Sequence, residues 1–260
     1  MKQSIFLTIV IIVTLAIALG IYIFVLGNPS NFKDAESRQA PLNLLGTIYT
    51  GGIIVPILIM LTLMNLTLVF ERTFSLRKAN GKSSITLFLQ SIQKHLLAGK
   101  VDDAIKACDA QRGSAANIIR TGLNRYKEIV SDGKLDAEKK MAETKRAIEE
   151  ATSLETPLLE RNLIALSTIA SIATMFGLLG TVIGMIRSFR ALAAQGGAPD
   201  AIQLSIGISE ALINTALGLL AAILGIVAYN FFVTKVDNFT YMIDEASYNV
   251  VQILHSRTNE

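Results

Sequence analysis

The chain is built from long apolar stretches and one long polar stretch. Four apolar stretches are long enough to cross a hydrocarbon core, which takes about 20 residues at about 1.5 Å of rise per residue in a helix. They are Ile5–Leu26, Ile48–Phe70, Asn162–Ile186 and Leu204–Val233. The first three carry no charged residue, and the fourth carries only Glu210. The pattern predicts an all-α membrane protein with four transmembrane helices and long cytoplasmic helical extensions.

These stretches divide the chain into eight predicted segments. They are an N-terminal anchor (1–27), an outward loop (28–47), transmembrane helix 2 (48–70), a cytoplasmic helical domain (71–160), transmembrane helix 3 (161–187), a second outward loop (188–203), transmembrane helix 4 (204–233) and a cytoplasmic C-terminal helix (234–260). The alternative for the first stretch is a cleaved signal peptide, since Lys2 precedes it. Its length exceeds the usual apolar core of a signal peptide, so we expect a retained anchor.

The polar stretch 71–160 is predicted to be helical. Its apolar residues recur at helical spacing, at Leu87, Ile92, Leu96 and Leu97 and then at Val101, Ala104, Ile105 and Cys108. Breaks are expected at Gly99, Gly113 and Asp132-Gly133. Between Leu135 and Glu160, the spacing predicts surface ion pairs of Glu143 with Arg146 and of Lys145 with Glu149. We expect this last helix to run into the third transmembrane helix with a kink at Pro157, or to break just before it.

Composition and charge support this division and add an orientation. Mean hydropathy is +0.47, and residues 71–160 hold 16 of the 24 Lys and Arg and 13 of the 21 Asp and Glu. Lys and Arg near the ends of membrane helices mark the cytoplasmic side. Eight flank the side of 71–160, namely Lys2, Arg72, Arg77, Lys78, Lys82, Arg146, Arg161 and Lys235, against Lys33, Arg38, Arg187 and Arg190 on the other. Residues 71–160 and both termini are therefore predicted to be cytoplasmic.

Several classes of function are disfavoured. A net charge of +3 is too small to indicate binding to nucleic acid. The single cysteine, Cys108, excludes an internal disulfide, and with His95 and His255 it cannot make a structural zinc site. The chain has no phosphate-loop lysine, no dinucleotide glycine pattern and no nucleophile with a histidine in a plausible context. We therefore expect no enzyme activity, no cofactor and no metal.

The third apolar stretch carries a row of hydroxyl groups. Ser167, Ser171, Thr174, Thr181 and Ser188 follow one face of a helix, beside the small residues Ala170, Gly177, Gly180 and Gly184. Such a face contacts protein or water rather than lipid, and small residues let another helix approach closely. Simple helix packing, with each hydroxyl bonded to its own helix, is the alternative.

The fourth apolar stretch carries Glu210. A carboxylate in a membrane costs about 3 kcal/mol or more, so it persists where it faces a cavity, a partner or an ion path. The alternative is that Glu210, six residues into the stretch, reaches the outer interface. Asn214 lies about 40° from Glu210 around the helix, whereas Thr215 lies about 140° away. Glu210 and Thr215 are thus not expected to point at one axis.

Two motifs on these last stretches resemble a known family. Gly177-Leu-Leu-Gly-Thr181-Val-Ile-Gly184-Met-Ile is followed by Gly207-Ile-Ser-Glu210-Ala-Leu-Ile-Asn-Thr215-Ala-Leu-Gly218-Leu and then by Tyr229-Asn230. The pair is similar to the signature of the MotA/TolQ/ExbB proton channel family, most of all to its ExbB and TolQ branch. The chain departs from the family at Ala173–Phe176, Asn214 and Leu224, where Ala-Pro-Leu-Leu, Ala and Pro are frequent, and its first apolar stretch exceeds the usual three-span plan.

The resemblance implies a subunit of a proton-driven motor in a bacterial inner membrane, with its outward loops in the periplasm. It implies a homo-pentamer around two single-span helices of an ExbD- or TolR-like partner that carries a membrane Asp, and a TonB- or TolA-like transducer. The implied pore residues are Thr181, Thr215 and Glu210. The residue pattern itself adds Ser171, Thr174 and Asn214 as secondary pore candidates and places Gly177, Gly180, Gly184 and Gly218 in helix packing.

A non-conducting membrane scaffold that holds an oligomer together is the alternative function. The driven process stays open between nutrient import, envelope maintenance and motility. Hydroxyl-lined walls without further carboxylates favour protons over sodium.

Overall fold

The computed structural model describes residues 2–34, 36, 38, 40–132, 136–193 and 201–258, and these form helices joined by turns. The described part contains no β-strand, only an isolated bridge between Phe32 and Pro41. The chain folds into two compact units. The apolar unit comprises Met1–Phe70 and Asn162–Asn230, and the charged unit comprises Glu71–Arg161 and Phe231–Glu260. The prediction of an all-helical protein is confirmed.

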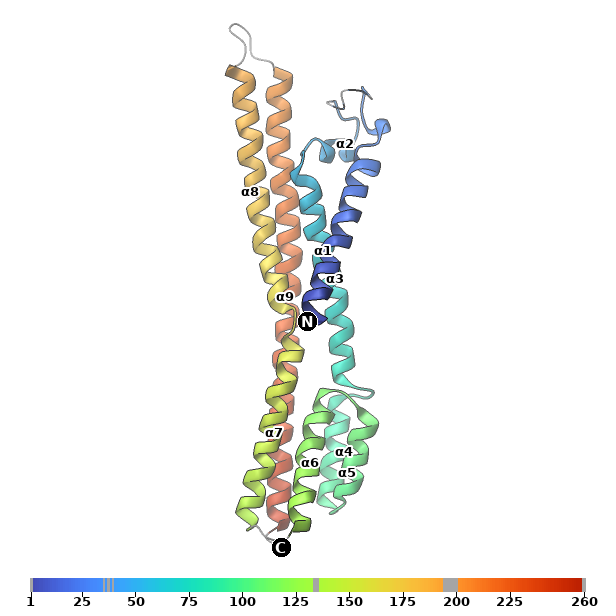
Figure 1. The fold of residues 1–260 in the computed structure, drawn as a ribbon, viewed down its shortest axis with the longest axis vertical. Helices are drawn as coiled ribbons and strands as arrows, with labels where there is room; N and C mark the ends of the chain where they lie inside the picture. The colour runs from blue at the N-terminus through green and yellow to red at the C-terminus, as the bar shows by residue number, and fades with distance from the viewer. Residues whose placement is uncertain are drawn as a thin grey trace. The chain divides into compact units, whose positions relative to one another are not determined.

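The apolar unit holds the long apolar helices (Figure 1). They are α1 (Lys2–Gly20) with a π-helical turn η1 (Ile21–Leu26), α3 (Ile54–Asn80) up to Phe70, α8 (Leu163–Ala193) and the first half of α9 (Ala201–Thr258). The short helices η2 (Pro29–Asn31) and α2 (Leu44–Tyr49) lie between α1 and α3. Among the described residues, four helical stretches are long and apolar enough to cross a membrane, as predicted.

The second membrane helix begins later than the sequence suggests. We expected one helix from Ile48, but α2 ends at Tyr49 and α3 starts at Ile54. Between them Gly52 has a φ of +75°, a backbone conformation that a right-handed helix does not contain. The apolar pattern continues unchanged through this turn, so the break between α2 and α3 could not be predicted from it.

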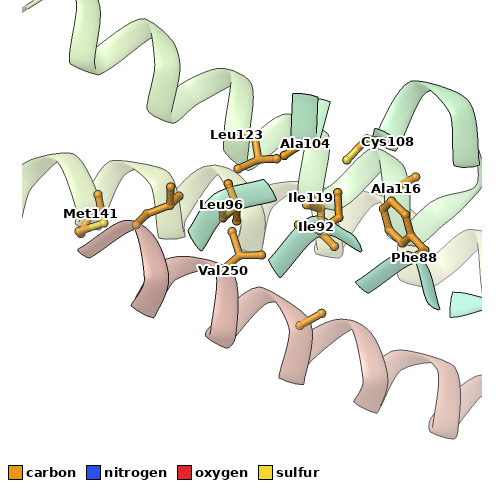
Figure 2. Packing of buried hydrophobic residues seen from close by; sticks show 12 residues of the cluster. Phe88, Ile92, Leu96, Ala104, Cys108, Ala116, Ile119, Leu123, Met141 and Val250 are labelled. Atoms are coloured by element: carbon orange, nitrogen blue, oxygen red, sulfur yellow. The ribbon is translucent and has the colours of Figure 1, made fainter. Parts of the chain in front are cut away.

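The charged unit is a helical bundle with its own core. It contains α4 (Ile85–Leu97), α5 (Val101–Gln111), α6 (Ser114–Asp132), α7 (Ala137–Glu160) and the end of α9. Figure 2 shows the core, to which each of these helices contributes. Its buried residues are Phe88, Ile92, Leu96, Ala104, Cys108, Ala116, Ile119, Leu123, Met141, Ala246, Val250 and Leu254. Two residues of the predicted apolar pattern, Leu87 and Leu97, are exposed instead.

Turns end the helices of the charged unit at two of the predicted glycines. Gly99 (φ +74°) and Gly113 (φ +91°) take the left-handed conformation, which confirms both breaks. The break predicted at Asp132-Gly133 falls at the edge of the described residues, and Gly133 lies outside them.

The junction between α7 and α8 differs from the prediction. α7 passes through Pro157 and ends at Glu160, and the chain turns at Asn162, where φ is +63°. The helix neither runs into α8 nor stops before Pro157. Pro157 lies in the last turn of α7 and cannot donate a backbone hydrogen bond. Only three residues of the helix follow it, so the missing bond interrupts little of α7.

The surface ion pairs of α7 agree with the prediction in part. Lys145 and Glu149 pair at 3.7 Å. Glu143, however, pairs with Arg125 of α6 at 3.1 Å, and Arg146 pairs with Glu150 at 3.0 Å. Glu143 and Arg146 therefore have other partners, because α6 offers a cation that spacing along α7 could not reveal.

Candidate functional site

α8 and α9 lie side by side in the apolar unit and touch through glycines (Figure 1). A Cβ atom on Gly184 would lie 2.6 Å from the carbonyl oxygen of Gly207, and one on Gly218 would lie 2.8 Å from the Cα of Gly177. A Cβ on Gly180 would overlap the side chain of Asn214. Gly177 of α8 meets Gly218 of α9, whereas Gly184, further along α8, meets Gly207, which comes earlier in α9. The two helices are therefore antiparallel. We call this contact the glycine seam.

The hydroxyl groups of α8 mostly bond to their own helix. Thr181 donates from Oγ1 to the carbonyl of Leu178 at 2.6 Å, Ser171 to that of Ser167 at 3.1 Å, and Thr174 to that of Ala170 at 3.1 Å. Ser171 is exposed, whereas Thr174 and Thr181 are half-buried. A hydroxyl oxygen that donates one bond can still accept others, so each group remains available to a partner.

Thr215 and Asn214 of α9 point to different neighbours. The half-buried Thr215 donates across the glycine seam to the carbonyl of Gly177, with 3.4 Å between the oxygens. Asn214 is fully buried, and its Nδ2 donates to the carbonyl of Gly51 at 2.8 Å. Asn214, a secondary pore candidate in the sequence analysis, lies within the subunit against the turn before α3.

Glu210 is buried and paired. Its side chain is 4% exposed and forms an ion pair with Arg187 at the end of α8, which is 54% exposed. Gly52 has a φ of +75°, which favours glycine, and a Cβ atom there would lie 2.6 Å from Oε1 of Glu210. Within the subunit the carboxylate is directed toward Gly52 and Arg187. Glu210 and Asn214, one helical turn apart, thus both contact the turn at Gly51-Gly52.

Arg187, the partner of Glu210, was missed by the sequence reasoning. We counted it only as a flanking charge of the third apolar stretch. A signal existed, because a carboxylate in a membrane helix needs a cation and Arg187 is the first one after that stretch. Asn65 of α3 was also missed; its Nδ2 donates to the carbonyl of Ala221 at 2.9 Å and ties α3 to α9.

A polar cavity of about 550 Å³ lies next to the ion pair. Its lining includes Arg187, Arg38 and Gln203, together with Tyr22 and Tyr49. The two tyrosine rings stack at 4.7 Å between centroids, and the Arg38 guanidinium lies 5.9 Å from the Tyr49 ring centroid. Arg187 therefore lines this cavity and also forms the ion pair with Glu210. A cavity with this many polar groups is suited to water.

Comparison with known proteins assigns the chain to a family. A model described as the MotA/TolQ/ExbB proton channel family matches residues 110–245. The chain is 31% identical over 191 residues to the Tol-Pal system protein TolQ of Pseudomonas aeruginosa, a match that covers 72% of this chain and 81% of TolQ. This chain belongs to the MotA/TolQ/ExbB proton channel family.

Two further matches come from the same branch. The chain is 31% identical over 159 residues to the biopolymer transport protein ExbB of Xanthomonas campestris, covering 55% of this chain and 62% of that protein. It is 39% identical over 89 residues to the ExbB of Pseudomonas putida, covering 34% of this chain and 27% of that protein. The predicted resemblance to the ExbB and TolQ branch is thereby confirmed.

Family membership and the four apolar helices together make the chain a multi-pass protein of the inner membrane. The family match includes Thr181, Glu210 and Thr215, and therefore both sides of the glycine seam. Within the ranges that the structure describes, no three His, Cys, Asp or Glu side chains are grouped to hold a metal ion.

Proposed function

We propose that this chain is the channel subunit of a proton-driven motor that energises a partner complex at the outer membrane. The observation that carries the proposal is the match to a proton channel family over the segment that includes Thr181 and Thr215. The relatives are named for the Tol-Pal system and for biopolymer transport. The driven process for this chain is accordingly envelope maintenance of the Tol-Pal type or TonB-dependent transport.

The proton pathway runs along α8 and α9. Thr181 of α8 and Thr215 of α9 are half-buried hydroxyls, and Ser171 and Thr174 lie nearer the N-terminal end of α8. Hydroxyl groups donate and accept hydrogen bonds without carrying charge, so they can solvate a proton at low cost. In this proposal a partner of the ExbD or TolR type supplies the titrating Asp, and the threonines form the wall that faces it.

Several copies of the chain surround that partner. Large apolar side chains remain exposed on α8 beside Thr181, including Met175, Leu178 and Val182, and on α9 beside Thr215, including Leu212 and Leu219. In a membrane, lipid or neighbouring copies cover such faces. A homo-pentamer around two partner helices fits the family plan, with the charged unit and both termini in the cytoplasm.

Glu210 has a supporting role in this mechanism. Its charge is matched by Arg187, and it is packed against Gly52 inside the subunit. A paired, buried carboxylate holds α9 in place more readily than it carries protons, because binding a proton would neutralise it and end its attraction to Arg187. Asn214, bonded to Gly51, fixes the same segment.

The two threonines provide the test. Thr181→Val and Thr215→Val remove one hydroxyl each at nearly constant volume, so we expect proton uptake into proteoliposomes holding the chain and its co-purified partner to fall to background. Thr168→Val is the matched control, because Thr168 also bonds to its own helix, at 2.8 Å from the Ile164 carbonyl, and lies on an exposed part of α8 outside the signature. Oligomer mass should be unchanged in all three variants.

The alternative of a non-conducting scaffold rests on the glycine seam, which could serve assembly alone. If both threonine variants kept full proton uptake, the pore assignment would be wrong. If the unmodified complex conducted no protons with its partner present, the scaffold would be the better description.

A further inference from the structure

Two turns of the charged unit are held together by one buried side chain. One turn, around Gly81, joins α3 to α4, and the other, around Gly113, joins α5 to α6. Gln111 is only 5% exposed. Its Nε2 donates to the carbonyls of Asn80 at 3.0 Å and Ser83 at 2.8 Å, and its Oε1 accepts from the Ser83 amide at 3.1 Å. The turns therefore have a fixed relative position.

A cavity of about 530 Å³ lies against these turns and is lined by cations. Lys78 comes from α3, Lys82 from the first turn and Arg112 from the second. All three are exposed, and none forms an ion pair with another described residue. The acid among the described lining residues is Glu155, which accepts a hydrogen bond from Asn117 at 3.1 Å. Three cations against one carboxylate leave a net charge of +2.

The chemistry of the lining suits a phosphate group. Lysine ammonium groups bind phosphate as point charges, and an arginine can bind two of its oxygens at once. Ser75 and Ser114 add hydroxyls to the lining, and Ser114 also begins α6, where free backbone amides favour an anion. Leu158 on the same lining offers an apolar surface to the rest of the ligand.

The position of these residues along α3 indicates a lipid phosphate. α3 is uncharged from Ile54 to Phe70, and Ser75 and Lys78 follow Phe70 by five and eight residues. On a continuous helix these steps are about 8 and 12 Å. The headgroup layer extends about 5–8 Å past the hydrocarbon core, and a long lysine side chain can reach back into it.

We propose that this cavity binds the phosphate group of an anionic phospholipid of the cytoplasmic leaflet, held by Lys78, Lys82 and Arg112. The lipid fastens the charged unit to the membrane surface. This role does not depend on proton conduction.

The test compares two triple variants of the full chain. The first, Lys78→Gln with Lys82→Gln and Arg112→Gln, removes the cavity cations. The control, Lys94→Gln with Lys100→Gln and Lys139→Gln, removes the same charge from exposed lysines outside the cavity. Native mass spectrometry measures retention of phosphatidylglycerol, with phosphatidylcholine and inorganic phosphate as parallel probes.

We expect phosphatidylglycerol binding to weaken about fivefold per cation removed, so roughly a hundredfold in the first variant, and to stay near the original in the control. Arg112→Lys, which keeps the charge, should bind within a few-fold of the original. Folding is checked by Cys108, whose buried thiol stays unreactive to iodoacetamide while the core is intact. A variant that fails this check is replaced by its three single substitutions.

Three results would overturn the proposal. The first is equal weakening in both triple variants, which would indicate attraction to total charge. The second is unchanged retention of phosphatidylglycerol in the first variant. The third is equal occupancy by inorganic phosphate at the same concentration, which would mean that the ligand is a free anion rather than a lipid.

Discussion

Glu210 and Arg187 show, at the scale of single residues, how a carboxylate is kept in an apolar helix pair. The two side chains lie 23 positions apart in the sequence and form an ion pair in the fold. A carboxylate and a cation that lose water together recover part of the cost through their mutual attraction, whereas either one alone does not. The same reasoning applies to Arg72, which is buried and paired with Glu71 at 2.6 Å.

A double-mutant cycle tests this pair. Arg187→Gln leaves Glu210 buried without its cation, so we expect the free energy of unfolding to fall by about 2 kcal/mol, as measured by thermal unfolding. This is less than for a fully buried pair, because the Arg187 side chain is half-exposed. Arg187→Gln combined with Glu210→Gln should lose less than the sum of the two single changes, by about 1 kcal/mol. Strictly additive losses would show that the pair contributes nothing.

At the scale of helices, the glycine seam determines how closely α8 and α9 approach each other. Gly184 faces the backbone of Gly207 and Ala211, and Gly177 faces Gly218, so main-chain atoms of α8 and α9 are in direct contact. The close approach also brings the Gly177 carbonyl within 3.4 Å of Thr215. Without the glycines, the hydroxyl of Thr215 would lose this partner on α8.

Replacing one seam glycine should separate the helices. In Gly184→Ala the new Cβ would lie 2.6 Å from the Gly207 carbonyl and 2.7 Å from the Ala211 amide nitrogen, and backbone atoms can yield only by moving α9. We expect a destabilisation of about 1–3 kcal/mol in thermal unfolding. Gly20→Ala on α1 is the matched control, because its Cβ would meet nothing within 4 Å. Equal midpoints for the two variants would contradict tight contact at the seam.

The whole molecule divides its chemistry between its two units. The apolar unit contains Thr181, Glu210 and Thr215, whereas the charged unit contains a separate helical core and most of the ionised side chains. The two units share α3 and the 58-residue α9. The family match, over residues 110–245, covers parts of both units and therefore extends beyond the two motifs.

Cysteine labelling of intact cells tests the predicted orientation. Ser30→Cys lies in the loop predicted to face outward and Ser131→Cys lies at the end of α6, and both positions are exposed. A membrane-impermeant maleimide should label Ser30→Cys directly and Ser131→Cys only after permeabilisation.

Background labelling should be low, since burial raises the pKa of the Cys108 thiol to about 12, far above neutral pH, and leaves almost no reactive thiolate. Direct labelling of Ser131→Cys together with protection of Ser30→Cys would mean that the orientation is reversed.

The sequence alone determined the features that depend on local composition. The four apolar helices follow from run length, the breaks at Gly99 and Gly113 from glycine, and the family from two motifs on adjacent helices. Each of these signals can be read from the order of residues along the chain, where helix geometry and solvation act directly.

The tertiary structure decided the features that depend on distant neighbours. The apolar pattern cannot show that α3 begins only at Ile54, because Gly51-Gly52 turns to meet Asn214 and Glu210 of α9. Nor can it show that Glu210 pairs with Arg187, because the contact requires α8 and α9 to pack antiparallel. A buried polar group takes the partner that the fold brings within reach, and that partner can lie anywhere in the chain.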